Sequence, residues 1–229
     1  MKNSDHAIKG LLRAIKIGLW LVPVLPLYVP TSLIYPFTTG RNFAFRIIVE
    51  VVFILWLGLI ALDRSYRPRG TIILHAISLF LFVTFIANIL SPNPWRAFFS
   101  DYERMGGFIS TFHYYLYFLL LISAFRTTRD WLIFFVTSLT ISSITVIVAL
   151  LNEAGVTLVV PGGIILAHKA RAEATLGNSS YLAGYLLFHT WLALLYATQS
   201  LHHRKRMIAF GAVVGLCLTG IYFTSNRSA

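Results

Sequence analysis

Long apolar stretches separated by short polar segments set the pattern of this chain. A helix that crosses a bilayer needs about 20 mostly apolar residues, and windows of that kind recur along the whole sequence. They predict seven spans, over residues 13–34, 43–62, 71–90, 109–125, 131–151, 180–199 and 208–225. We therefore expect an all-α fold in which residues 1–229 form a single polytopic transmembrane helix bundle.

Composition agrees with a membrane protein, because 57% of the residues are hydrophobic and only 12% are charged. The net charge of +11 is spread along the chain and does not predict a nucleic-acid-binding surface. The single cysteine, Cys217, lies in an apolar run and has no partner for an intramolecular disulfide. The basic N-terminus leads into a run broken by Pro23, Pro26 and Pro30, which indicates a retained helix that is kinked toward its outer end.

The distribution of lysine and arginine predicts how the chain is oriented. Short cytoplasmic loops carry an excess of these residues. With the N-terminus in the cytoplasm, 12 of the 19 cations fall inside. The seven that fall outside are Arg41, Arg46, Arg96, Arg104, Lys169, Arg171 and Arg227. We expect a multi-pass protein of the inner (cell) membrane with its N-terminus in the cytoplasm.

Two segments near the expected outer face carry charges. Arg46 and Glu50 are four residues apart, hence on one helix face, and are expected to pair with each other inside the bundle. Aromatic residues recur at helical spacing over 95–105, which predicts a short interfacial helix on the outer face. Arg96, Glu103 and Arg104 lie on its polar side, either as solvated charges or as secondary substrate contacts.

The longest outer loop, residues 152–179, precedes a predicted helix start. Val156 to Val160 and Gly163 to Leu166 flank a Pro-Gly pair, so that a small hairpin or a re-entrant segment is expected. Gly177 breaks the helical pattern, and Asn178, Ser179 and Ser180 are residue types that cap a helix. With Lys169 and Arg171 close by, an open helix N-terminus could bind phosphate. The alternative is that these cations contact lipid headgroups or water.

Three segments resemble the membrane core of the O-antigen ligase and polymerase family. They are R-A-E-A-T-L-G-N-S-S-Y-L-A-G-Y before one span, T-S-N-R-S-A at the end of the next, and S-P-N-P-W-R-A-F-F-S-D-Y-E-R-M-G-G upstream. The resemblance covers residues about 70–229. Ala174 stands where the family usually has glycine and Ser180 where it has asparagine, and Asn226 and Ser228 alter its serine-arginine-glycine motif.

The resemblance implies glycosyl transfer at the outer face of the inner membrane. The donor would be a polyprenyl-pyrophosphate-linked glycan, and the acceptor a lipid or a glycan. Arg171 and Arg227 match the arginines that hold the pyrophosphate, with Asn178 and Ser179 at the same helix start. No metal or other cofactor is implied. A histidine that acts on the acceptor lies in a later periplasmic loop in the family, so no catalytic residue is assigned, and this chain is expected to be an inactive N-terminal part of such a protein.

Two other functions compete with this one. Outward arginines, a broken loop and an intramembrane Arg46–Glu50 pair would also suit a transporter or flippase for an anionic lipid-linked substrate. Such transporters are often built from repeats, and none is visible in the sequence. A non-catalytic membrane subunit is the third interpretation.

Overall fold

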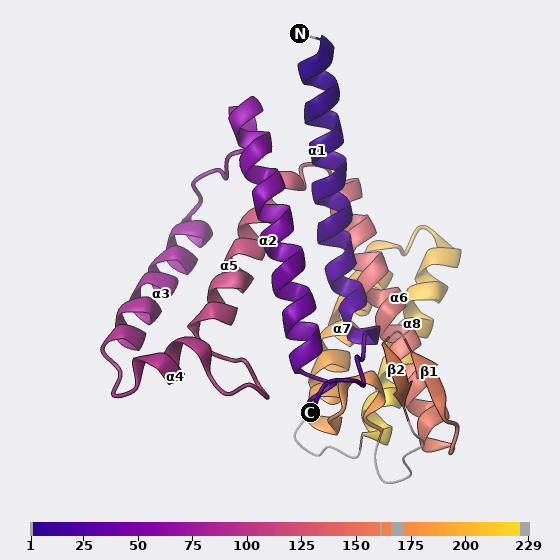
Figure 1. The fold of residues 1–229 in the computed structure, drawn as a ribbon. Coiled ribbons are helices and arrows are strands. Elements are labelled where there is room, and N and C mark those ends of the chain that lie inside the picture. Colours follow the sequence, from indigo (N-terminus) through magenta and orange to yellow (C-terminus); the bar gives the residue numbers. More distant parts are fainter. Residues whose placement is uncertain (1, 161, 166–171, 225–229) are drawn as a thin grey trace. The chain divides into compact units, whose positions relative to one another are not determined.

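The structure is a computed structural model that describes residues 2–160, 162–165 and 172–224. Over these residues the fold is helical apart from one small hairpin (Figure 1). The helices are α1 (Lys2–Leu21), α2 (Thr39–Leu62), α3 (Ile72–Ile89), α4 (Pro94–Phe99), α5 (Phe108–Ala124), α6 (Thr128–Glu153), α7 (Ser179–Gln199) and α8 (Arg204–Phe223). The helical class predicted from the sequence is confirmed.

The chain divides into two compact units. The first comprises Met1–Val22 and Arg41–Leu132, and the second comprises Pro23–Gly40 and Ile133–Ala229. The single bundle over residues 1–229 stays a prediction.

Among the described residues, five helical segments are long and apolar enough to cross a membrane. They are Asp5–Leu27, Thr39–Leu62, Ile72–Ile89, Thr128–Glu153 and Arg204–Phe223. Helix α5 is apolar but has 17 residues, about 25 Å at the usual rise per residue. Helix α7 has 21 residues but includes polar ones such as His189 and Thr190.

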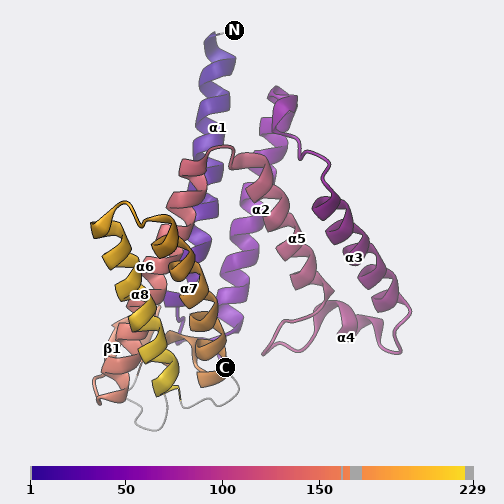
Figure 2. The same cartoon turned by 180° about the vertical axis from the view of Figure 1, so that it is seen from behind.

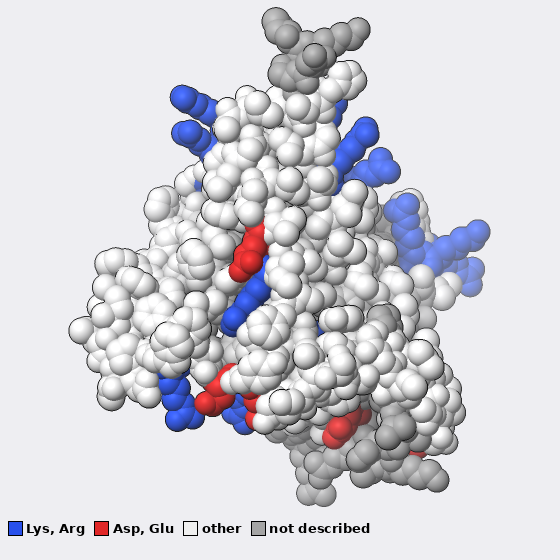
Figure 3. Space-filling model, viewed as in Figure 1, with Lys and Arg blue, Asp and Glu red and all other residues white. Residues whose placement is uncertain are grey.

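The exposure of α3 indicates a lipid environment. None of its residues is buried, and three large apolar side chains, those of Leu79, Phe80 and Phe82, are each more than 60% exposed. An apolar patch of this extent is rare on the surface of a soluble monomer. On the face shown in Figure 3, charged side chains gather in a few groups separated by broad uncharged areas. The chain therefore has the character of a membrane-embedded protein.

Proline ends the first helix as the sequence predicted. Helix α1 stops at Leu21, two residues before Pro23, and continues as a 3-10 helix over Val22–Leu27 with Pro26 inside it. Proline has no backbone N–H to donate and its ring clashes with the preceding turn, so a regular α-helix does not persist here.

In the first unit, α5 packs against both α1 and α3, and α4 lies where α3 ends and α5 begins (Figure 1). One ion pair joins the two ends of this unit's sequence. Lys16 Nζ donates to Asp130 Oδ1 at 2.7 Å, and both side chains are largely buried. Asp130 also accepts from the backbone N–H and the hydroxyl of Thr127, so that its charge is satisfied at the start of α6.

In the second unit, α7 and α8 lie side by side (Figures 1 and 2). Their core contains Val146 of α6, Leu182 and Leu186 of α7, and Cys217 of α8, each fully buried. His189 is also buried and bonds to the hydroxyl of Ser138 on α6 at 2.8 Å. Its ring therefore packs between these helices.

The predicted hairpin is present. Strand β1 (Leu158–Val160) pairs antiparallel with β2 (Gly163–Ile165), and Val160 lies opposite Gly163. Gly162 has a φ of 98° at the turn, and its carbonyl accepts from the N–H of Thr31 at 3.1 Å. A side chain at position 163 would collide with that of Thr31, so glycine lets the hairpin pack against the segment after the first helix.

Candidate functional site

The start of α7 is capped as the sequence predicted. The Asn178 side-chain oxygen accepts from the N–H groups of Ser180 and Tyr181, at 2.8 and 3.3 Å, and Ser179 is buried. These bonds correct the expectation of an open helix N-terminus. Asn178 already satisfies two of the N–H groups that an open helix N-terminus would offer to an anion. This helix end therefore has fewer free N–H groups than the sequence predicted.

The backbone before α7 is tightly constrained. A 3-10 helix spans Ala174–Leu176, and Gly177 follows with a φ of 65°, a left-handed conformation that favours glycine. Ala174 has a φ of 49° and is buried. Ala174 therefore adopts a left-handed backbone conformation that favours glycine.

Arg171 and Arg227, which are predicted to bind pyrophosphate, lie outside the described residues, as does Lys169, a possible secondary contact. The described residues come closest at Ala172, directly after Arg171, and at Thr224, three positions before Arg227. The N–H of Ala172, next to Arg171, donates to the carbonyl of Phe223 at the end of α8, at 3.3 Å. Ala172 and Thr224 are both buried. The chain after Arg171 and the chain shortly before Arg227 are thus in direct contact.

A shallow cavity of about 420 Å³ opens beside this contact. Leu150, Glu153 and Ala154 at the end of α6 line it together with Phe223. One carboxylate oxygen of Glu153 is buried and has no hydrogen-bond partner among the described residues. Sequence reasoning missed Glu153, although an acidic residue at the outer end of a predicted span could have indicated it.

The possible secondary substrate contacts, Arg96, Glu103 and Arg104, lie in the first unit. Asn93 caps α4 and Pro94 occupies its first position, but the helix ends at Phe99, before the predicted end at Met105. Ser100 follows with a φ of 61°, which lies outside the range of a right-handed helix, so the helix ends before it. Arg96 pairs with Asp101 at 3.2 Å with both side chains exposed, and the carbonyl of Arg104 accepts from Asn42 at 3.1 Å. Glu103 follows in a turn. An exposed ion pair contributes little stability.

The polar pair predicted in the second span has different partners. Arg46 does not pair with Glu50: its guanidinium donates to the carbonyl of Met105 at 3.2 Å and to the hydroxyl of Ser110 at 2.7 Å. Glu50 instead contacts the His113 ring at 3.0 Å, and the other ring nitrogen of His113 faces the carbonyl of Ile109 at 2.7 Å. Two contacts between α2 and the region of α5 thus replace one contact within α2.

Comparisons with family models, curated proteins and solved structures found no match to this chain. The class of this protein therefore rests on its own helices and their apolar surfaces, which are those of a helical, membrane-embedded protein.

Proposed function

We propose that this chain is the donor-binding part of a membrane glycosyltransferase of the O-antigen ligase or polymerase type. It would cross the bacterial inner membrane seven times with its N-terminus in the cytoplasm, and α4 would lie at the outer surface. The substrate would be a polyprenyl-pyrophosphate-linked glycan, and the acceptor a lipid or a glycan. The motifs around Arg171 and Arg227 suggest this function.

The observation that carries the proposal is the hydrogen bond from Ala172 to Phe223. It brings together the backbone beside Arg171 and the end of α8, which directly precedes the T-S-N-R-S-A motif. Two guanidiniums reaching the same place can hold a pyrophosphate by paired charge-assisted hydrogen bonds. Their separation along the sequence, 56 positions, is no obstacle once α7 and α8 pack together.

The chemistry needs such a site. In the transfer, the acceptor hydroxyl oxygen bonds to the anomeric carbon of the donor sugar and gives up its proton, while the bond from that carbon to the pyrophosphate breaks. Negative charge develops on the leaving pyrophosphate. Fixed cations can stabilise that charge without a metal. Electrostatic stabilisation of this kind is the largest single contribution to the rate enhancement of many enzymes. The group that accepts the proton is not assigned within this chain.

One of the features that suggested a transporter is not found in the structure. That alternative drew on an ion pair between Arg46 and Glu50, whereas each of these residues binds a different partner in the first unit. No observation in the second unit favours transport over transfer, and we propose only the latter.

Binding of the donor lipid tests the proposal. The chain in lipid nanodiscs should bind polyprenyl pyrophosphate at least tenfold more tightly than polyprenyl monophosphate, because one more charge-assisted contact is worth about 1.5–3 kcal/mol. A chelator should leave the affinity unchanged. Equal affinity for the two lipids, or for the uncharged polyprenol, would refute a pyrophosphate site.

The proposed orientation predicts which loops face the periplasm. In a Cys217→Ala background, cysteines replacing Thr128 and Leu201 should resist an impermeant thiol reagent in intact cells, whereas a cysteine replacing Thr157 should react. All three positions are exposed in the structure, so burial would not prevent the reaction. Labelling at position 201 but not at 157 would reverse the orientation and place the proposed site in the cytoplasm.

A further inference from the structure

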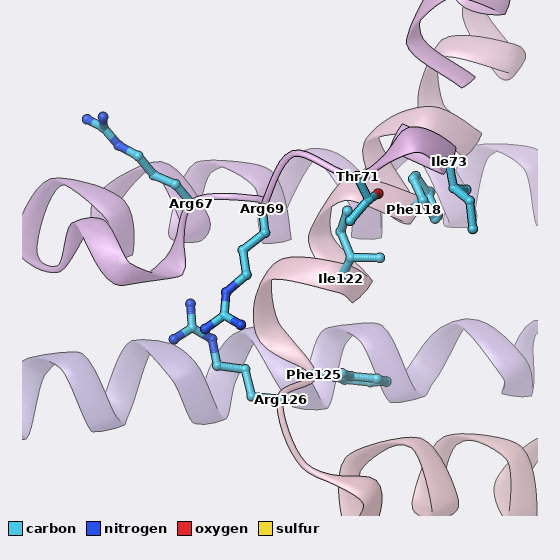
Figure 4. A pocket seen from close by; sticks show the side chains of 8 residues that line it. All are labelled: Arg67, Arg69, Thr71, Ile73, Phe118, Ile122, Phe125 and Arg126. Carbon is cyan, nitrogen blue, oxygen red and sulfur yellow. The ribbon is translucent and has the colours of Figure 1, made fainter. Parts of the chain in front are cut away.

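A second pocket, of about 440 Å³, lies in the first unit between the start of α3 and the end of α5. Its lining has a cationic part and an apolar part (Figure 4). The cationic part is formed by Arg67, Arg69 and Arg126. The apolar part is formed by Ile73, Phe118, Ile122 and Phe125, and Thr71 completes the lining. A binding site with one charged and one apolar end suits an amphiphile with an anionic head.

Protein contacts fix Arg126, whereas Arg69 has no polar partner among the described residues. The Arg126 guanidinium donates to the carbonyl of Ser65 and lies 4.1 Å from the centre of the Tyr66 ring. Arg69 makes no hydrogen bond or ion pair among the described residues. Figure 4 shows its guanidinium pointing toward that of Arg126, whereas Arg67 points away. Two neighbouring cations repel each other unless an anion lies between them.

Among the described residues, no acidic side chain lines the pocket to provide that anion. Asp63 is the acidic residue of the same loop, and its carboxylate accepts from the backbone N–H of Ser65 at 2.8 Å. Hydrogen bonds from Ser65 hold the pKa of Asp63 below its usual range, and the charge of Arg126 lowers it further. Asp63 therefore stays ionised as the cap of the short helix Arg64–Tyr66 and does not enter the pocket lining.

We propose that this pocket binds an anionic glycerophospholipid, with its phosphate between Arg69 and Arg126 and an acyl chain along Phe118 and Ile122. Basic pockets between membrane helices bind anionic lipid headgroups in this way. The loops that hold these arginines, 63–71 and 125–127, meet through the bond from Arg126 to Ser65. The cation distribution assigns both loops to the cytoplasmic side, so this site is separate from the proposed pyrophosphate site and does not depend on it.

Native mass spectrometry of the chain with added phosphatidylglycerol tests the proposal. Arg69→Gln should lower phosphatidylglycerol affinity by about tenfold or more, because it removes one charge-assisted contact to the phosphate. Ile122→Trp should also lower it by filling the apolar part with the charges intact. Arg129→Gln, an exposed cation near the start of α6 that does not line the pocket, should change it less than twofold.

Three outcomes would overturn this site. They are an equal loss in Arg69→Gln and Arg129→Gln, an unchanged affinity in Ile122→Trp, and equal retention of phosphatidylcholine by the unaltered chain. A fourth arm adds inorganic phosphate. If it displaces phosphatidylglycerol at millimolar concentration, the pocket recognises phosphate alone and the proposed role of its apolar wall is wrong. Thermal unfolding of each variant in detergent confirms that it is folded.

Discussion

Replacing Arg171 or Arg227 with lysine is expected to weaken polyprenyl pyrophosphate binding by about 10- to 150-fold, the effect of losing one charge-assisted hydrogen bond of about 1.5–3 kcal/mol. Lysine keeps the charge but cannot make the planar, two-pronged contact of a guanidinium. The measurement is lipid binding by the chain in nanodiscs, titrated with polyprenyl pyrophosphate.

The matched control for this pair is Arg204→Lys, at the first residue of α8 and thus at the other end of that helix from Phe223. It should leave affinity within twofold of the unaltered chain. If Arg171 and Arg227 only reach toward lipid headgroups, lysine would serve as well in both positions. Near-unchanged binding in both lysine variants would therefore remove the proposed site and leave the fold untouched.

Gly177→Ala is expected to destabilise the second unit by about 2–5 kcal/mol. Two effects add: a non-glycine residue in the left-handed conformation costs about 1–2 kcal/mol, and overpacking costs about 1–3 kcal/mol. The φ of Gly177 is 65°, and a Cβ there would fall inside contact distance of the Phe37 ring. Denaturant unfolding in detergent measures the loss, and donor binding should fall with it, because Gly177 directly precedes the Asn178 cap.

Gly184→Ala provides the comparison for this change. Gly184 lies within α7, and a Cβ added there meets no atom within 4 Å. Alanine in a helix interior is usually more stable than glycine by about 0.5–1 kcal/mol. The two glycine-to-alanine changes are thus expected to act in opposite directions, and equal effects would contradict the account of the segment before α7.

Helix positions were predictable because hydropathy and capping are local properties of the sequence. The expected spans at 43–62 and 180–199 agree with α2 and α7 to within a few residues, and Asn178 and Pro94 act where their side chains predict. The end of α4 was not predictable, because the aromatic spacing continues past Phe99 while the backbone turns at Ser100.

Contacts between helices were harder to predict, since a single sequence does not show how its helices rotate against one another. Glu50 and His113 are 63 positions apart, and only packing of α2 with α5 brings them to 3.0 Å. A usable signal did exist. Both are polar residues at similar depth below the expected outer ends of their spans, and a buried polar group needs a partner. The contact of Ala172 with Phe223 left no such signal, because it joins two backbone groups.

Photo-crosslinking of the donor lipid tests the central claim most directly. A polyprenyl pyrophosphate with a photoreactive group next to the pyrophosphate is bound to the chain, irradiated, and the modified peptides are mapped by mass spectrometry. We expect adducts in residues 169–180 and 223–229, with both reduced in Arg171→Lys. Adducts confined to other segments, such as the arginine-rich loop at 63–71, would contradict a pyrophosphate site where Ala172 contacts the end of α8.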